Sequence, residues 1–148
     1  MRDMTMLDTQ HLRIGIIGAG GIVRNRHMPG LAEIDGAKVT AVCNRSKESG
    51  ETFAREYGVA DVYTDWREIV DSPDIDAVLI GAYPTMHCPV TLAALEAGKH
   101  VFCQARMAMN AREAKKMRDT ALEHPDLVTM ICPAPTGIAG DWMMRKLL

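Results

Sequence analysis

Short apolar runs alternate with helical patterns along this chain, and this alternation constrains the fold more than any other feature. Parallel strands joined by crossover helices produce such an order. Most of the runs are apolar at consecutive positions, as expected for strands that are covered by helices on both faces of a sheet. The expected strands are Leu12–Ile17, Lys38–Cys43, Val62–Tyr63, Ala77–Ile80, His100–Cys103 and Val128–Cys132.

Helix start and stop signals lie between these runs. Ser46 and Asn110 are predicted N-caps, and Glu113 completes a capping box with Asn110. Gly58 is a predicted helix stop, and Pro89 is predicted to open a helix. Right-handed crossovers then give an α/β fold of the Rossmann type, a doubly wound and mostly parallel sheet in a single domain. The expected helices are Gly21–Ile34, Ser46–Tyr57, Trp66–Val70, Pro89–Ala97 and Asn110–Glu123.

Length and composition narrow the classes of function. A chain of 148 residues suits one domain and leaves no room for a second full one. Its 17 basic and 19 acidic residues give a net charge of -2, which favours neither nucleic acid nor an anionic membrane surface. No signal peptide or membrane span is recognisable, so we expect a cytoplasmic protein. The four cysteines lack a C-x-x-C pair and fit reduced thiols, so we expect no metal site.

The first expected strand runs into a glycine-rich turn, "GAGGIV", at residues 18–23. It fits the dinucleotide fingerprint with a small apolar residue in place of the third glycine. Gly18 permits a tight turn, and Gly20 leaves the backbone bare so that a pyrophosphate can approach the N-terminus of the following helix. The alternative is a turn whose glycines serve only packing. The predicted nucleotide contacts are Gly18, Gly20, Gly21, Ile22 and Val23.

The residues after the second expected strand, "NRSK", bear on which nicotinamide cofactor is bound. An acidic residue there would accept hydrogen bonds from the ribose 2′-hydroxyl and repel a 2′-phosphate. Asn44 occupies that position, and Arg45, Ser46 and Lys47 can all donate to a phosphate. The pattern predicts NADP or NAD and favours NADP. The alternative is that Arg45 and Lys47 are solvated charges and that the Asn44 amide bonds a ribose hydroxyl.

Two stretches, "GIIGAGGIVRNRHMPGL" and "DIDAVLIGAYPTMHCPVTLAALEAGKHVFC", resemble the Gfo/Idh/MocA family of glucose-fructose oxidoreductases and inositol dehydrogenases. The resemblance implies an N-terminal NAD(P)-binding Rossmann domain at residues 12–135, after an extension at residues 1–11. It also implies that residues 136–148 begin the linker helix to a C-terminal substrate domain that this sequence lacks. The family acts on a sugar, a polyol or a related carbonyl compound.

The loop after the fourth expected strand follows the family's A-T-P-N-x-x-H pattern only in part. The histidine is in register as His87, whereas the proline has moved one place on, to Pro84. The resemblance implies that Ala82, Tyr83, Pro84 and His87 line the cofactor cleft. The alternative for His87 is a histidine that merely caps the helix.

After the fifth expected strand the family typically carries E-K-P, and this chain has Gln104, Ala105 and Arg106. Gln104 is a predicted cofactor contact. Ala105 cannot carry a proton, and the Arg106 guanidinium does not deprotonate at working pH, so the catalytic residues are unknown. Either acid–base groups come from elsewhere, or dehydrogenase chemistry has been lost while nucleotide binding was kept.

The sequence therefore predicts the cofactor-binding part of an NAD(P)-dependent oxidoreductase, inactive on its own. The alternative function is a catalytically inactive NAD(P)-binding sensor or regulatory module. Apolar residues at 141–148 predict self-association or packing against the missing domain. These apolar residues are Trp142, Met143, Met144, Leu147 and Leu148.

Overall fold

The computed structural model describes residues 11–132, and within them six parallel strands form one sheet in the order β3-β2-β1-β4-β5-β6. The strand order reverses between β1 and β4, which confirms the expected doubly wound Rossmann fold. The strands are β1 (Leu12–Ile17), β2 (Ala37–Cys43), β3 (Asp61–Tyr63), β4 (Ala77–Ile80), β5 (His100–Cys103) and β6 (Thr129–Ile131).

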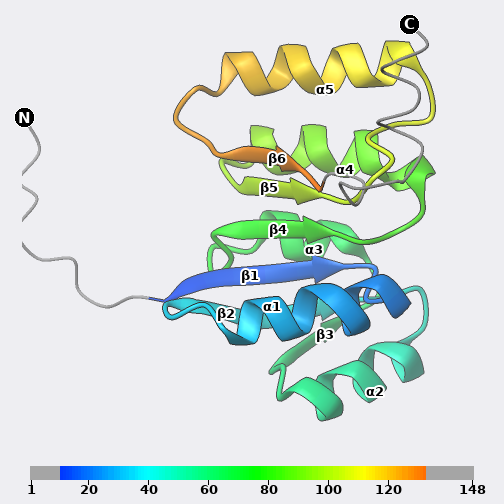
Figure 1. The fold of residues 1–148 in the computed structure, drawn as a ribbon, viewed down its shortest axis with the longest axis vertical. Coiled ribbons are helices and arrows are strands. Elements are labelled where there is room, and N and C mark those ends of the chain that lie inside the picture. The colour runs from blue at the N-terminus through cyan, green and yellow to red at the C-terminus, as the bar shows by residue number, and fades with distance from the viewer. Residues whose placement is uncertain (1–10, 133–148) are drawn as a thin grey trace, which may run out of the picture.

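Helices cover both faces of this sheet. From β1 the chain moves outward to β3, and after β3 it crosses back to β4 and continues to β6. Right-handed crossovers in opposite directions place their helices on opposite faces, so α1 and α2 lie in front of the sheet and α3 and α4 behind it (Figure 1). The helices are η1 (Val23–His27), α1 (Met28–Ala32), α2 (Lys47–Tyr57), α3 (Trp66–Asp71), α4 (Pro84–Glu96) and α5 (Ala111–Glu123).

Two apolar clusters form the core, and successive residues of a strand contribute to different clusters. Val101 and Cys103 of β5 belong to the cluster beneath α4 and α5, whereas Phe102 between them packs against the cluster that contains η1 and α1 residues. This alternation is the twofold side-chain period of a strand. Both faces of β5 are therefore covered, as the consecutive apolar residues in its sequence predicted.

Local capping signals are confirmed at two helices. Ser46 Oγ accepts a hydrogen bond from the Ser49 N–H at the start of α2, and Gly58 ends that helix with a φ of 68°. Asn110 Oδ1 accepts from the Glu113 N–H at 3.0 Å at the start of α5. These caps depend on residues three positions apart or fewer, which is why the sequence reveals them.

The start of α4 differs from the expectation: the helix begins at Pro84, and Pro89 lies inside it. Pro84 fits the first turn of the helix, because the first turn does not use its backbone N–H groups, whereas Pro89 lies beyond that turn. The earlier start buries His87 and Cys88 against the core, and this packing offsets the hydrogen bond that Pro89 cannot donate.

The first helical segment also differs from the regular helix expected over residues 21–34. It contains the π-helix η1, in which the Met28 N–H donates to the Val23 carbonyl five residues earlier, and α1 ends at Ala32. A π-turn widens the helix and shifts the side chains that follow it. The predictions for residues 1–10 and 133–148 lie outside the residues that the structure describes.

The amino edge of the sheet is held by an ion pair. The Arg13 guanidinium donates to both carboxylate oxygens of Asp76, at 2.8 and 3.0 Å, and this hydrogen bonding lowers the pKa of Asp76. Nearby, Lys99 Nζ donates to the carbonyl oxygens of Ser72 and Ile75. The charges at this edge bind one another and the backbone, which indicates a structural role.

We predict that Gly15→Ala destabilises the protein. A Cβ at Gly15, in β1, would overlap Cγ2 of the fully buried Ile69 of α3, so the substitution overpacks the core. We expect the free energy of unfolding to fall by about 1–3 kcal/mol in urea denaturation.

Gly30→Ala is the matched control, because no heavy atom lies within 4 Å of a Cβ at that helical position. We expect it to raise the free energy of unfolding by about 0.5–1 kcal/mol through helix propensity. Equal effects of the two substitutions would contradict this account of the core.

Candidate functional site

The turns after β1 and β4 touch at the carboxyl edge of the sheet, where the strand order reverses. Gly18 adopts a φ of 87°, and a Cβ there would lie 2.5 Å from the backbone of Ala82. A Cβ at Gly81 would lie 2.7 Å from the Gly18 carbonyl oxygen and would overlap Val23. Neither glycine accepts a side chain, so the two turns approach each other as closely as backbones can.

The next two glycines face open space. A Cβ built at Gly20 or at Gly21 meets no heavy atom within 4 Å, and both residues are exposed. The helical segment begins here, and the first N–H groups of a helix have no partners within it. The Gly20 N–H donates to the Gly18 carbonyl oxygen at 2.9 Å, so the N–H groups suited to an anion such as a pyrophosphate are those of the helix start beside this bare backbone.

Asn44, which follows β2, is tied to this glycine-rich turn. Its Oδ1 accepts a hydrogen bond from the Ala19 N–H at 2.7 Å. Because the backbone N–H is the donor, the bonded atom of Asn44 is the oxygen, and its NH₂ group is left for another acceptor. Asn44 therefore keeps both of its N–H donors for a ligand at this edge.

The residues after Asn44 divide into bonded and unbonded groups. The Ser46 hydroxyl caps α2 and donates to Ser49 Oγ at 3.0 Å, so it is already used within the helix start. Lys47 Nζ lies 3.8 Å from Glu51. Arg45 is exposed and forms no ion pair with any residue in the described range 11–132. Arg45 is thus the unengaged cation beside the Asn44 amide.

His87 lies inside α4 and connects two loops. Its side chain is 1% exposed, with Nδ1 2.7 Å from the Arg106 carbonyl oxygen and Nε2 3.0 Å from the Ala82 carbonyl oxygen. A neutral imidazole donates through one of these nitrogens and an imidazolium through both. His87 does not cap the helix, whose N-cap is Tyr83, and its side chain forms a buried bridge between two loops, while its predicted place at the cofactor cleft stays a prediction.

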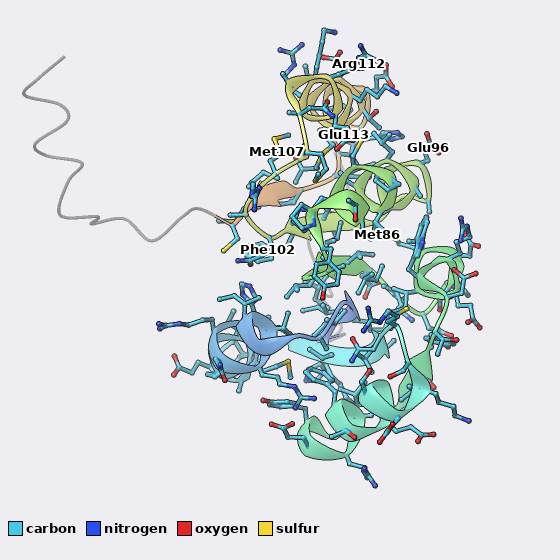
Figure 2. All side chains as sticks on the ribbon, turned by 90° about the vertical axis from the view of Figure 1, so that its right-hand side faces the viewer. Met86, Glu96, Phe102, Met107, Arg112 and Glu113 are labelled. Atoms are coloured by element: carbon cyan, nitrogen blue, oxygen red, sulfur yellow. The ribbon has the colours of Figure 1, made fainter. Side chains whose placement is uncertain are left out.

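The remaining loop residues expected at the cleft are more accessible. Tyr83 is 73% exposed at the N-cap of α4, next to Pro84 and the partly buried Ala82. Gln104 follows β5 directly, where its N–H donates to the Ile80 carbonyl at 3.0 Å. The strands point to the right in Figure 1, and Figure 2 faces the edge at which they end.

The structure adds His27 to this edge, a residue that the sequence analysis did not assign to the site. His27 Nε2 lies 2.6 Å from Gln104 Oε1, although the two residues are 77 positions apart. No local spacing signals this pair, because it depends on the π-turn of η1 and on the neighbouring position of β5. Val23, by contrast, is fully buried and packs rather than facing a ligand.

The cysteines do not form a reactive or metal-binding cluster. Cys43, Cys88 and Cys103 are buried, and burial raises the pKa of Cys43 and of Cys103 to about 11. Among residues 11–132, no group of three histidine, cysteine or acidic side chains is placed to hold a metal ion. Within the same residues, no helix is both long and apolar enough to cross a membrane.

The fold and this edge define a dinucleotide-binding domain, and the comparisons with known proteins agree. Residues 12–132 match the oxidoreductase family described as having an NAD-binding Rossmann fold. The chain belongs to this family, the Gfo/Idh/MocA oxidoreductases, as the sequence resemblance predicted.

The relatives include enzymes named for sugar and polyol substrates. The chain is 37% identical over 111 residues to the 1,5-anhydro-D-fructose reductase of Ensifer adhaerens, covering 75% of this chain and 33% of that protein. It is 35% identical over 114 residues to an inositol 2-dehydrogenase/D-chiro-inositol 3-dehydrogenase of Shouchella clausii, covering 76% and 33%. The chain thus spans about a third of the length of these curated relatives.

A solved structure shares the fold. The myo-inositol 2-dehydrogenase of Lactobacillus plantarum superposes with a TM-score of 0.77 at 31% identity, covering 83% of this chain and 36% of that one. The similarity is therefore to the nucleotide-binding part of a longer enzyme.

We predict that Cys43 and Cys103 resist alkylation in the native protein. With a pKa of about 11, each thiol is almost fully protonated at pH 8, and thiolate is the reactive form. Mass spectrometry after iodoacetamide treatment at pH 8 should show both cysteines labelled at least about 100-fold more slowly than in the urea-unfolded chain. Rapid native labelling of either one would contradict its burial.

Proposed function

We propose that this chain binds NADP and is the cofactor-binding part of a longer oxidoreductase that acts on a sugar, a polyol or a related carbonyl compound. The observation that carries the proposal is the open glycine-rich turn at the reversal of the strand order, with the Asn44 amide tied to it. A dinucleotide fits this edge because its pyrophosphate is an anion and its two halves extend to either side of the reversal.

The preference for NADP over NAD follows from the donors at the end of β2. The Asn44 oxygen already accepts from the Ala19 N–H, and a neutral amide lacks the negative charge with which an acidic residue here would repel a 2′-phosphate. Its NH₂ group and the exposed Arg45 guanidinium both donate, and a 2′-phosphate is a pure acceptor. The Ser46 hydroxyl is used in the α2 cap, so it would donate to the 2′-phosphate only after leaving that cap.

The proposed roles of the other residues follow their positions. Gly20, Gly21 and Ile22 hold the pyrophosphate through the start of the helical segment. Ala82, Tyr83, Pro84 and Gln104 line the nicotinamide half, at the ends of β4 and β5. Gly18, Val23 and His87 act indirectly, by keeping the turns in place. When bound, the dinucleotide supplies hydride transfer to or from a substrate carbon.

The substrate class is proposed from the family and from the named activities of the relatives. We further propose residues 12–135 as the cofactor domain, preceded by an extension at 1–11 and followed by a linker at 136–148. We also propose that the protein is cytoplasmic. Residues 141–148 are proposed to contact a second copy of the chain or a substrate domain.

A sensor or regulatory module is the second candidate, and one observation favours it. Ala105 and Arg106 are exposed after β5, and neither side chain transfers a proton at neutral pH. In the oxidoreductase proposal, the acid–base group and the enclosure of the substrate come from elsewhere, and the 148-residue chain alone has no turnover. In the sensor proposal, no group supplies that chemistry.

We predict that Gly20→Val abolishes NADP and NAD binding while the protein remains folded. The branched side chain would occupy the space above the turn, where it meets no protein atom. Isothermal titration calorimetry with both dinucleotides measures binding, and urea denaturation checks the fold. Undiminished binding by the folded variant would refute the proposed pyrophosphate site, and Gly30→Ala serves as a control at an equally open glycine.

We predict that the parent chain binds NADP more tightly than NAD and that Arg45→Ala removes most of the difference. A charge-assisted hydrogen bond contributes about 1.5 kcal/mol or more, roughly tenfold in Kd. Asn44→Asp should also favour NAD, because it keeps an acceptor for the Ala19 N–H but places a carboxylate against the phosphate. Equal affinities of the parent for NADP and NAD would contradict the preference. Arg112→Ala on α5, which removes the same charge elsewhere, is the control and should leave the preference unchanged.

A further inference from the structure

The contact between His27 and Gln104 joins the first helical segment to the end of β5. His27 Nε2 and Gln104 Oε1 are 2.6 Å apart, within hydrogen-bond distance, and both side chains are partly buried. The ring nitrogen is the donor in this pair, since the amide oxygen can only accept. The contact therefore fixes which end of the Gln104 amide faces η1.

The His27 ring is held on a second side. It meets the Phe102 ring edge-on, with centroids 5.4 Å apart and planes at 83°. Phe102 lies on the side of β5 that faces the first helical segment (Figure 2). The π-turn of η1 ends at His27 and sets its place against β5. The hydrogen bond to Gln104 and the edge-on contact with Phe102 together restrict the orientation of the imidazole.

The other end of the Gln104 amide is available. Its NH₂ group donates to no protein atom within the described residues. The buried side-chain atoms that lack a partner in this range do not include the nitrogen of that group. Solvent therefore reaches it at the edge where β4 and β5 end. The Gln104 backbone N–H is bonded to Ile80, so the side chain extends from an anchored position.

We propose that His27 is a positioning residue for the nicotinamide half of the dinucleotide. By donating to Gln104 Oε1, it turns the amide so that the NH₂ group points to an acceptor oxygen of the nicotinamide riboside. The inference rests on the proposed dinucleotide site and adds to it a residue from the first helical segment. His27 acts through Gln104 and does not itself contact the ligand.

The opposite end of the edge has the same arrangement. The Asn44 oxygen is bonded by the Ala19 N–H, as the Gln104 oxygen is bonded by His27, and each amide keeps its NH₂ group for a ligand. Both halves of a dinucleotide present oxygen acceptors in their ribose hydroxyls. The repetition at both ends matches the symmetry of such a ligand, with a nucleotide on either side of the pyrophosphate.

The test compares NADP with 2′-phospho-ADP, which lacks the whole nicotinamide riboside. Calorimetry should show that Gln104→Met weakens NADP binding by about 3- to 10-fold, the range of one hydrogen bond, and changes the affinity for 2′-phospho-ADP by less than about twofold. His27→Phe, which keeps a ring against Phe102, should show the same selective loss. The double variant should lose no more than Gln104→Met alone, because His27 acts through Gln104.

Several results would overturn the inference. Equal weakening of both ligands by His27→Phe would assign His27 a general structural role, and additive losses in the double variant would separate the two residues. If His27→Phe does not fold, His27→Leu, which also lacks a donor, replaces it in the cycle. His124→Phe, at the far end of α5, is the control and should change neither affinity.

The parent protein separates this inference from the proposed function. Failure of the parent to bind either ligand refutes the dinucleotide site and, with it, the role of His27. Binding of both ligands with no selective loss in Gln104→Met refutes only the role given to the His27–Gln104 pair.

Discussion

The close approach of the Gly18 and Gly81 turns is the constraint on which the rest of this edge depends. A side chain at either glycine would collide with the backbone of the other turn or with Val23. The contact lies where the strand order reverses, and it joins the half of the sheet that ends in β3 to the half that ends in β6. Asn44, Tyr83 and Gln104 follow the ends of β2, β4 and β5, which this contact keeps in register, and these are the residues proposed to meet the dinucleotide.

The two edges of the sheet use polar groups in different ways. At the amino edge, Arg13 and Asp76 pair with each other, and Lys99 bonds backbone carbonyls, so these charges are largely satisfied within the protein. At the carboxyl edge, Asn44 and Gln104 each bond the protein through the amide oxygen and keep the NH₂ group, and Arg45 has no ion pair within residues 11–132. Asn44, Gln104 and Arg45 therefore keep N–H donors that suit the acceptor oxygens of the proposed phosphate-bearing dinucleotide.

The loop after β5 shows how family membership and chemistry can separate. The chain belongs to an oxidoreductase family, yet Ala105 stands where the family resemblance places a lysine. Gln104, the neighbouring position, is still anchored through its backbone to Ile80 and through its side chain to His27. The framework for holding a nucleotide is thus preserved around a position that cannot transfer a proton. Substrate chemistry must be sought in groups other than Ala105.

Much of the fold followed from local signals in the sequence. The strand at residues 12–17, the Ser46 and Asn110 caps and the glycine-rich turn each depend on residues close together in the chain, whose conformational preferences act over one turn or one strand. The doubly wound arrangement followed as well, because right-handed crossovers leave few ways to connect such elements. Even the family could be recognised from two stretches.

Other features were decided only when distant segments met. The start of α4 at Pro84, the buried bridge of His87 and the pairing of His27 with Gln104 arise from packing between elements, and no spacing in the chain encodes them. The use of the Ser46 hydroxyl within its own cap likewise depends on a side-chain rotamer. A hydrogen bond between residues 77 positions apart forms because the sheet sets β5 beside the first helical segment, and this geometry exists only in the folded chain.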